Sequence, residues 1–130
     1  MLFRSWVGGH FGTGPDGSIL TGRVGSDVEP EAAAVAARSA ALNLLATVRA
    51  ALGTLDAVAR FVHVHAAVNS APDFTGQTAV IDAASRLLTD VFGERGRHAR
   101  LAVGVAALPG NLVLEIEAVL EVADIAGTSA

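Results

Sequence analysis

Arg100 and Glu115 are the two side chains whose chemistry and spacing point most directly to a reaction site. Both lie in residues 97–117, where alternating side chains around a Pro-Gly-Asn turn predict two β-strands. The arginine stands where the first strand begins, and the glutamate lies in the middle of the second. A planar guanidinium matches a carboxylate, and a nearby glutamate can hold a water molecule. Pairing of the strands across the turn would bring the two side chains together, where they could act on a small carboxylic acid.

The overall composition predicts one acidic domain with part of its surface against another subunit. The chain has 130 residues and a mass of 13.2 kDa, which suits a single domain over residues 1–130. Hydrophobic residues make up 52% of it and the mean hydropathy is +0.49. The formal charge is −4, and the nine cationic residues are arginines scattered along the chain. Nucleic-acid binding is therefore disfavoured, because that function needs a concentrated basic surface.

Two residue types, lysine and cysteine, are missing from the sequence, and this narrows the possible chemistry. Without a lysine amine, the protein cannot form a Schiff base with a substrate or with pyridoxal phosphate. Without cysteine, it has no thiol nucleophile, disulfide or thiolate metal site. His63 and His65 are two residues apart in a predicted strand, but this pair without a third ligand is weak evidence for a metal. We therefore expect no cofactor and no metal.

The N-terminal residues and the apolar runs predict a cytoplasmic protein with no membrane partner. The first ten residues lack the basic start and the long apolar core of a secretion signal. Elsewhere, polar residues and prolines are expected to interrupt the apolar runs before they reach the roughly 18 residues that a membrane span needs. The interruptions are Arg38, Asn43, Arg49, Pro109, Asn111 and the C-terminal glutamates.

Hydrophobic periodicity predicts an α+β fold, a mixed β-sheet with two helices packed on one face. The expected strands are residues 2–7, 58–69, 101–108 and 112–122, and the expected helices are residues 30–52 and 76–92. Residues 8–27 are rich in glycine and turn formers, with a tight turn at 15–17. Residues 124–130 are expected to form a flexible tail.

The side-chain pattern also predicts which faces are buried. In the first helix, the expected apolar face carries Val35, Leu42, Leu45 and Leu52. In the last strand, the even-numbered residues from 112 to 122 form an apolar face that should lie under the helices. The opposite face mixes valines with acids, including Glu115, as a subunit interface or a wet cleft does.

Six spaced motifs give the chain a family resemblance. In order they are Asp-Val-x-Pro-Glu, Ala-Ala-Arg-x-x-Ala-Leu-Asn-Leu-Leu-Ala, Ala-Leu-Gly-x-Leu-Asp, Val-Asn-Ser-Ala-Pro-Asp-Phe, Val-Phe-Gly-Glu-x-Gly-Arg-His-Ala-Arg and Leu-Pro-Gly-x-x-x-x-Glu-Ile-Glu. With them, residues 22–122 resemble the RidA family, also called YjgF or L-PSP, in its branch with the Gly-Arg-His-Ala-Arg and Val-Asn-Ser-Ala-Pro-Asp-Phe signatures. The resemblance implies a chorismate-mutase-like fold and a homotrimer with three clefts between neighbouring subunits.

The same resemblance implies a hydrolytic deaminase that needs no cofactor. Its substrates would be reactive enamines and imines, such as 2-aminoacrylate and 2-imino acids, and its products 2-keto acids and ammonia. Arg100 occupies the position of the family's catalytic arginine and would grip the substrate carboxylate. Glu115 matches the glutamate that orients the attacking water, and backbone groups near Ala102 would hold the imine nitrogen.

Other positions of the implied site differ from the family pattern. Gly8-Gly9-His10 stands where Ser-Gly-Gln is usual, so Gly9 and a titratable His10 are expected to contact the substrate. Asp82 stands where an asparagine is common and is expected there too.

These departures leave two alternatives open. One is a specialised biosynthetic-pathway enzyme that reuses the same cleft for another imine-type step, and the other is a non-catalytic trimer that binds small metabolites such as keto acids. Ribonuclease activity, associated with an older family name, is the weakest candidate because the chain is acidic.

Overall fold

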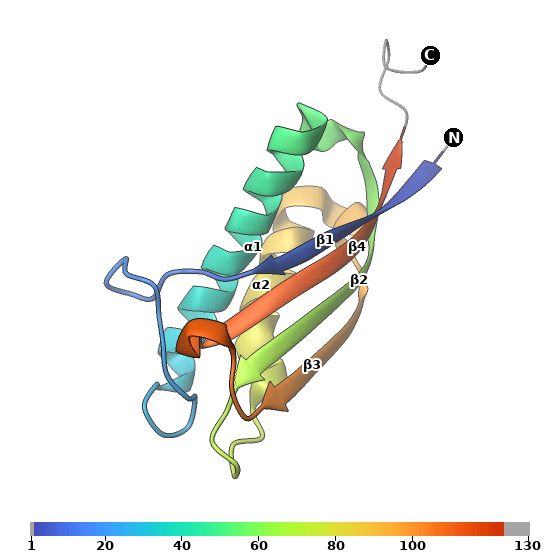
Figure 1. The fold of residues 1–130 in the computed structure, drawn as a ribbon. Helices are drawn as coiled ribbons and strands as arrows, with labels where there is room; N and C mark the ends of the chain where they lie inside the picture. Colours follow the sequence, from blue (N-terminus) through green and yellow to red (C-terminus); the bar gives the residue numbers. More distant parts are fainter. Residues whose placement is uncertain (1, 124–130) are drawn as a thin grey trace.

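Four strands and two long helices make up the computed structural model, which describes residues 2–123. The strands are β1 (Leu2–His10), β2 (Val58–Asn69), β3 (Ala99–Val105) and β4 (Leu114–Ala123), and the helices are α1 (Pro30–Leu52) and α2 (Gln77–Phe92). Both helices cover the same face of the sheet and leave the other face open (Figure 1). The mixed α+β architecture expected from the sequence is confirmed, whereas the expected tail at 124–130 lies outside the described residues.

The first helix begins and ends where its sequence predicts. Pro30 opens it, where a missing N–H does no harm, and Glu31 lies in the first turn beside the positive end of the helix dipole. Gly53 ends it in the left-handed conformation, with φ 81°, and its N–H donates to the Arg49 carbonyl oxygen.

The buried face of α1 differs from the expected one. Val35 and Leu42 are each 44% exposed, so half of the predicted apolar face points outward. The helix instead packs through small residues and a few larger ones, namely Ala33, Ala36, Ala37, Ala40, Ala41, Leu44, Leu45 and Val48. The prediction was wrong because it weighted large side chains, while this helix lies close to its neighbours through alanines.

By length and composition, α1 is also the one helix within residues 2–123 that would be long and apolar enough to cross a membrane. The interruptions at Arg38, Asn43 and Arg49 therefore do not shorten the apolar stretch as expected. In this fold the alanine-rich face of the helix belongs to the core shared with α2 and β4.

The strand order of the sheet is β1-β4-β2-β3, and this corrects the expected terminal hairpin. β3 pairs in parallel with β2, because α2 makes the crossover between them. β4 pairs antiparallel with β2 on its other side and with β1 beyond. β2 therefore lies between β3 and β4, and these two strands do not pair.

The connection from β3 to β4 is held over the end of β2 by one buried amide. The Asn69 side chain is fully buried, and its Nδ2 donates to the Asn111 side chain and to the Leu112 carbonyl oxygen, both at 3.1 Å. The turn at Pro109–Asn111 is thus a crossing over the sheet end, with Asn111 at a positive φ of 56°. A Pro-Gly-Asn sequence suits a hairpin and this crossing equally well.

Candidate active site

Arg100 lies on β3, at one edge of the sheet, and points toward the helices. Its register partner on β2 is Val64, a buried core residue, so the two side chains share the helix-covered face. The guanidinium donates to Asp82 Oδ1 at 2.9 Å and to Ser85 Oγ at 3.1 Å, both on α2. A longer contact of 3.5 Å reaches the Thr78 carbonyl oxygen. Because only 17% of the Arg100 side chain is exposed, α2 holds the guanidinium in one orientation.

Ser85 and His98 extend this network, although their sequence positions gave no prediction that they belong to the site. Ser85 Oγ lies 2.9 Å from His98 Nε2, and His98 Nδ1 lies 2.6 Å from the Gly96 carbonyl oxygen. A carbonyl only accepts, so Nδ1 carries the proton and Nε2 accepts from the serine hydroxyl. Burial lowers the pKa of His98 below its ordinary value of 6.5, and the Arg100 charge adds to this effect. A neutral His98 therefore fixes the serine that supports Arg100.

Ala102 and Gly104 continue the same row along β3, beyond Arg100 on the helix-covered face. The row leads to a cavity of about 380 Å³ between the end of β3 and the start of α2, with Ser70 and Gln77 in its wall. A Cβ at Gly104 would lie 2.6 Å from Gln77 Nε2 and 3.2 Å from Ser70 Oγ. Glycine at this position thus lets the Gln77 amide and the Ser70 hydroxyl lie close against β3.

Glu115 lies on the opposite, open face of the sheet. Its neighbours Leu114 and Ile116 are buried under the helices, so the alternation of β4 turns Glu115 away from them. It lines a cavity of about 220 Å³ with Gly9, His65 and Glu117 among the other walls. A Cβ at Gly9 would fall on Glu115 Oε2, so this glycine is what lets the carboxylate lie against β1.

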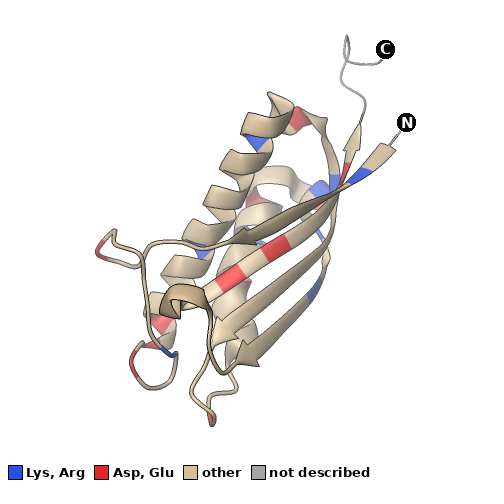
Figure 2. Ribbon diagram, in the orientation of Figure 1, with Lys and Arg blue, Asp and Glu red and all other residues tan. Residues whose placement is uncertain are grey.

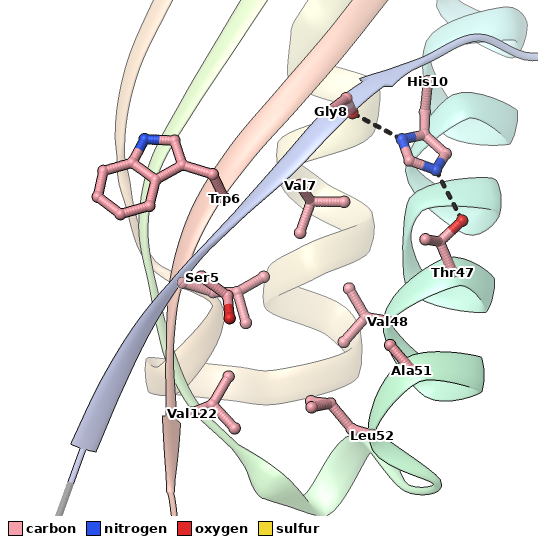
Figure 3. Close-up of a pocket in the computed structure, with 11 residues that line it drawn as sticks. Ser5, Trp6, Val7, Gly8, His10, Thr47, Val48, Ala51, Leu52 and Val122 are labelled. Carbon is pink, nitrogen blue, oxygen red and sulfur yellow. Dashed lines mark hydrogen bonds between the residues drawn. The ribbon is translucent and has the colours of Figure 1, made fainter.

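His10 is in a third place, at the end of β1, and points toward α1 (Figure 3). Its Nδ1 lies 2.8 Å from the Gly8 carbonyl oxygen, and its Nε2 lies 2.7 Å from Thr47 Oγ1 on α1. It closes one end of a cavity of about 230 Å³ whose walls include Val7, Val48 and Leu120. Within one chain, His10 is therefore separated from Arg100 by the width of the sheet.

The expected proximity of Arg100 and Glu115 is wrong for a single chain. Arg100 is in register with Val64, which is in register with Ala118, three residues from Glu115. With strands about 4.8 Å apart and a rise of about 3.4 Å per residue, their backbones are about 14 Å apart. Their side chains also leave the sheet on opposite faces. The structure thus brings Arg100, Asp82 and Ala102 together, groups Glu115 with Gly9, and leaves His10 apart.

Among residues 2–123, no group of three or more histidine, cysteine, aspartate or glutamate side chains is arranged to hold a metal ion. His63 and His65 lie on the open face, where they line a shallow cavity with Trp6 and Glu117. The His65 ring nitrogen lies 3.4 Å from a Glu117 oxygen, which gives this histidine an acidic neighbour in place of a third ligand.

Comparison with known proteins gives a consistent family assignment. Residues 7–122 match the family described as "YjgF/chorismate mutase-like, putative endoribonuclease". The chain is 43% identical over 116 residues to Protein TCP17 of Trypanosoma cruzi, covering 88% of this chain and 72% of that protein. A solved protein of unknown function from Agrobacterium tumefaciens is 44% identical with a TM-score of 0.86, covering 92% of this chain and 76% of its own.

Two further solved structures extend the comparison. A protein named as a putative endoribonuclease from Shewanella oneidensis is 27% identical with a TM-score of 0.85, and the match covers 92% of this chain and 79% of that one. RidA from the Antarctic bacterium Psychrobacter shares the fold alone, at 24% identity and a TM-score of 0.57 over 90% of this chain and 79% of its own.

Proposed function

Because the chain belongs to the YjgF/chorismate-mutase-like family, as its RidA-like motifs predict, we propose that it hydrolyses small reactive 2-imino acids and their enamine tautomers. The products are 2-keto acids and ammonia, and no cofactor takes part. The observation that carries the proposal is the oriented Arg100 guanidinium beside a row of small residues. A bidentate donor of this kind suits the carboxylate that all these substrates share.

The working unit in this proposal is a homotrimer with clefts between subunits. Arg100 and Glu115 leave the sheet on opposite faces, so a site that contains both needs Arg100 from one chain and Glu115 from its neighbour. The surface of the single chain supports association, since Trp6 is 75% exposed and Leu101 is 51% exposed on the open face. Large apolar side chains at these exposures favour burial against another copy.

The reaction needs positioning more than a strong catalyst, because a protonated imine is already electrophilic. Arg100 binds the carboxylate, and the backbone near Ala102 holds the nitrogen. The neighbour's Glu115 takes a proton from water as the water oxygen bonds to the imine carbon, and the C=N electron pair moves to nitrogen. Glu115 then returns the proton to nitrogen. As the C–N bond breaks and the C=O bond forms, Glu115 accepts the hydroxyl proton of the intermediate and passes it to the departing ammonia, which leaves as ammonium. Iminium acid and water thus give keto acid and ammonium.

The cavity that begins at Gly104, two residues beyond Ala102 on the same row, also suits a small substrate side chain. The cavity beyond Gly104 has a volume of about 380 Å³ and an amide and a hydroxyl in its wall. Imines derived from alanine, serine or 2-aminobutanoate would fit there with room for water.

A trapping assay tests the proposal. A dehydratase generates 2-iminopropanoate or 2-iminobutanoate, semicarbazide traps the free imine, and the added protein competes for it. We expect the wild-type protein to suppress the adduct and Arg100→Ala to leave it unchanged. A correctly assembled wild-type protein that suppresses nothing would reject the deaminase and favour the pathway enzyme or the metabolite-binding trimer.

Ribonuclease activity, which the names of some relatives suggest, has less physical support. The net charge is −4, and acidic residues follow β4 while the arginines are dispersed (Figure 2). Arg100 could meet one phosphate at most, and within residues 2–123 no second arginine takes part in its hydrogen-bond network. RNA binding would need a basic surface that neutralises several phosphates at once.

A further inference from the structure

The acid that holds Arg100 gives this site an unusual charge balance. Asp82 Oδ1 lies 2.9 Å from the guanidinium, and both side chains are only partly exposed, 39% for the acid and 17% for the arginine. In the family that the motifs resemble, asparagine is common at this position. A neutral asparagine would leave the positive charge of the arginine without a negative partner. Here the pair is neutral overall, and its two charges lie side by side between β3 and α2.

From this ion pair we infer that Asp82 makes the clamp selective for zwitterions, so that the site binds a protonated 2-imino acid in preference to a keto acid. The inference rests on the proposed function, because it concerns the same site. A keto acid has only a carboxylate, so its attraction to Arg100 is offset by repulsion from Asp82. A protonated imino acid carries its positive nitrogen one carbon away from its carboxylate, a spacing that lets each end meet an opposite charge.

Asp82 would then act on the reaction in two ways. It favours the protonated form of the bound imine, which is the form that water attacks more readily. It also repels the product, since hydrolysis removes the positive group and leaves the 2-keto acid with a single negative charge next to the aspartate. The same residue therefore promotes capture of the reactive species and release of the harmless one.

Asp82 contacts Arg100 directly, so its effect on ligand binding should differ from that of an acid elsewhere on the surface. Ser85 lies one turn further along α2 and donates to His98, so the arginine has a second, uncharged partner that can hold its orientation. Asn at position 82 keeps the shape and can still accept a hydrogen bond from the guanidinium. The Asp82→Asn change therefore removes the charge with little effect on geometry.

The test compares two ligands that differ in charge type. Calorimetry measures binding of 2-oxobutanoate, an anion, and of 2-aminobutanoate, a zwitterion, to the wild-type protein and to Asp82→Asn. We expect the variant to bind the keto acid about tenfold more tightly and to lose preference for the zwitterion, which corresponds to about 1.4 kcal/mol. Imine turnover in the trapping assay should fall about tenfold. Asp90→Asn, an exposed acid two turns further along α2, is the matched control and should change neither ratio.

Each outcome decides between the two proposals. An unchanged ligand ratio in Asp82→Asn, or an equal shift in Asp90→Asn, overturns the charge selection even if the wild-type protein is an active deaminase. The expected shift in ratio without any imine turnover supports the charge selection and rejects the deaminase. Failure of the wild-type protein and of both variants to bind either acid overturns the carboxylate clamp itself, and with it both proposals.

Discussion

Mixing two inactive variants should restore activity if each cleft takes Arg100 and Glu115 from different chains. The two variants are Arg100→Ala and Glu115→Gln, and each removes one of the groups that lie on opposite faces of the sheet. A cleft of a cyclic trimer works only when one chain supplies the arginine and its neighbour supplies the glutamate. In a random equal mixture, each requirement is met half of the time, so about a quarter of the clefts should be intact.

The assay co-expresses the two variants with different affinity tags and purifies trimers that carry both. Each such trimer has one intact cleft of three, whichever chain is present twice, so it should show about one third of the wild-type rate in the semicarbazide assay. The separate variants, purified in the same way, set the background. A second mixture gives an independent value. Wild type and the double variant are combined at random in equal amounts, and the rate per amount of total protein is compared with that of pure wild type. It should be about a quarter of the wild-type rate for interchain sites and about half for sites within one chain.

No recovery in trimers verified to contain both tags would refute the reasoning, because it would mean that Arg100 of one chain and Glu115 of its neighbour do not act in the same cleft. Retention of half the activity in the second mixture would place the whole site within one chain. That result would require a large rearrangement, since the backbones of the two residues are about 14 Å apart across β2.

Three further predictions test other parts of the structure. Light scattering should give a mass of about 40 kDa for three chains of 13.2 kDa, and a monomer would contradict the interchain site. Gly9→Ala should lower imine turnover about tenfold or more by displacing Glu115, with little change in melting temperature, whereas Gly8→Ala, where an added Cβ meets nothing within 4 Å, should keep the wild-type rate. Because the pKa of His98 is lowered in the folded state, the unfolded chain binds more protons below pH 6.5, so the free energy of unfolding should fall as pH drops from 6.5 through the lowered value. Denaturant unfolding of His98→Gln across this range should show a weaker dependence, and an identical profile would contradict the assigned burial effect.

Local features of the sequence predicted the elements well. The boundaries of α1 and β2 follow from Pro30, Gly53 and the alternation after residue 57, all of which act within a few residues of chain. From Leu114 to Val122 the buried face of β4 was equally clear, because acids and Val119 alternate there with apolar residues. This alternation alone is therefore enough to assign Glu115 to the face turned away from the helices. The prediction of this face was wrong at its start, where Leu112 lies before the strand and is half-buried while Val113 is buried.

The face of Arg100 was harder to predict because β3 has almost no contrast between its two sides. Leu101 and Val103 lie on one side and Ala102 and Gly104 on the other, so both sides are apolar or small. The side with the smaller residues turned out to face α2, since Arg100 on that side donates to Asp82 and Ser85. Hydrophobic periodicity identifies the buried face of a strand only when its exposed face is polar. A strand whose open face is also apolar, as at a subunit interface, shows no such alternation.

The order of the strands could have been inferred by weighing two connections against each other. A strand, a helix of 16 residues and another strand predict a parallel pair made by a right-handed crossover, here β2 and β3. Once β3 occupies one side of β2, a hairpin would place β4 at the outer edge, where its fully apolar face would lack cover from α1. Placing β4 on the other side of β2 puts that face under α1 and leaves Asn69 to hold the crossing chain. The burial of β4 therefore excludes the hairpin, and with it any site that a single chain would build from Arg100 and Glu115.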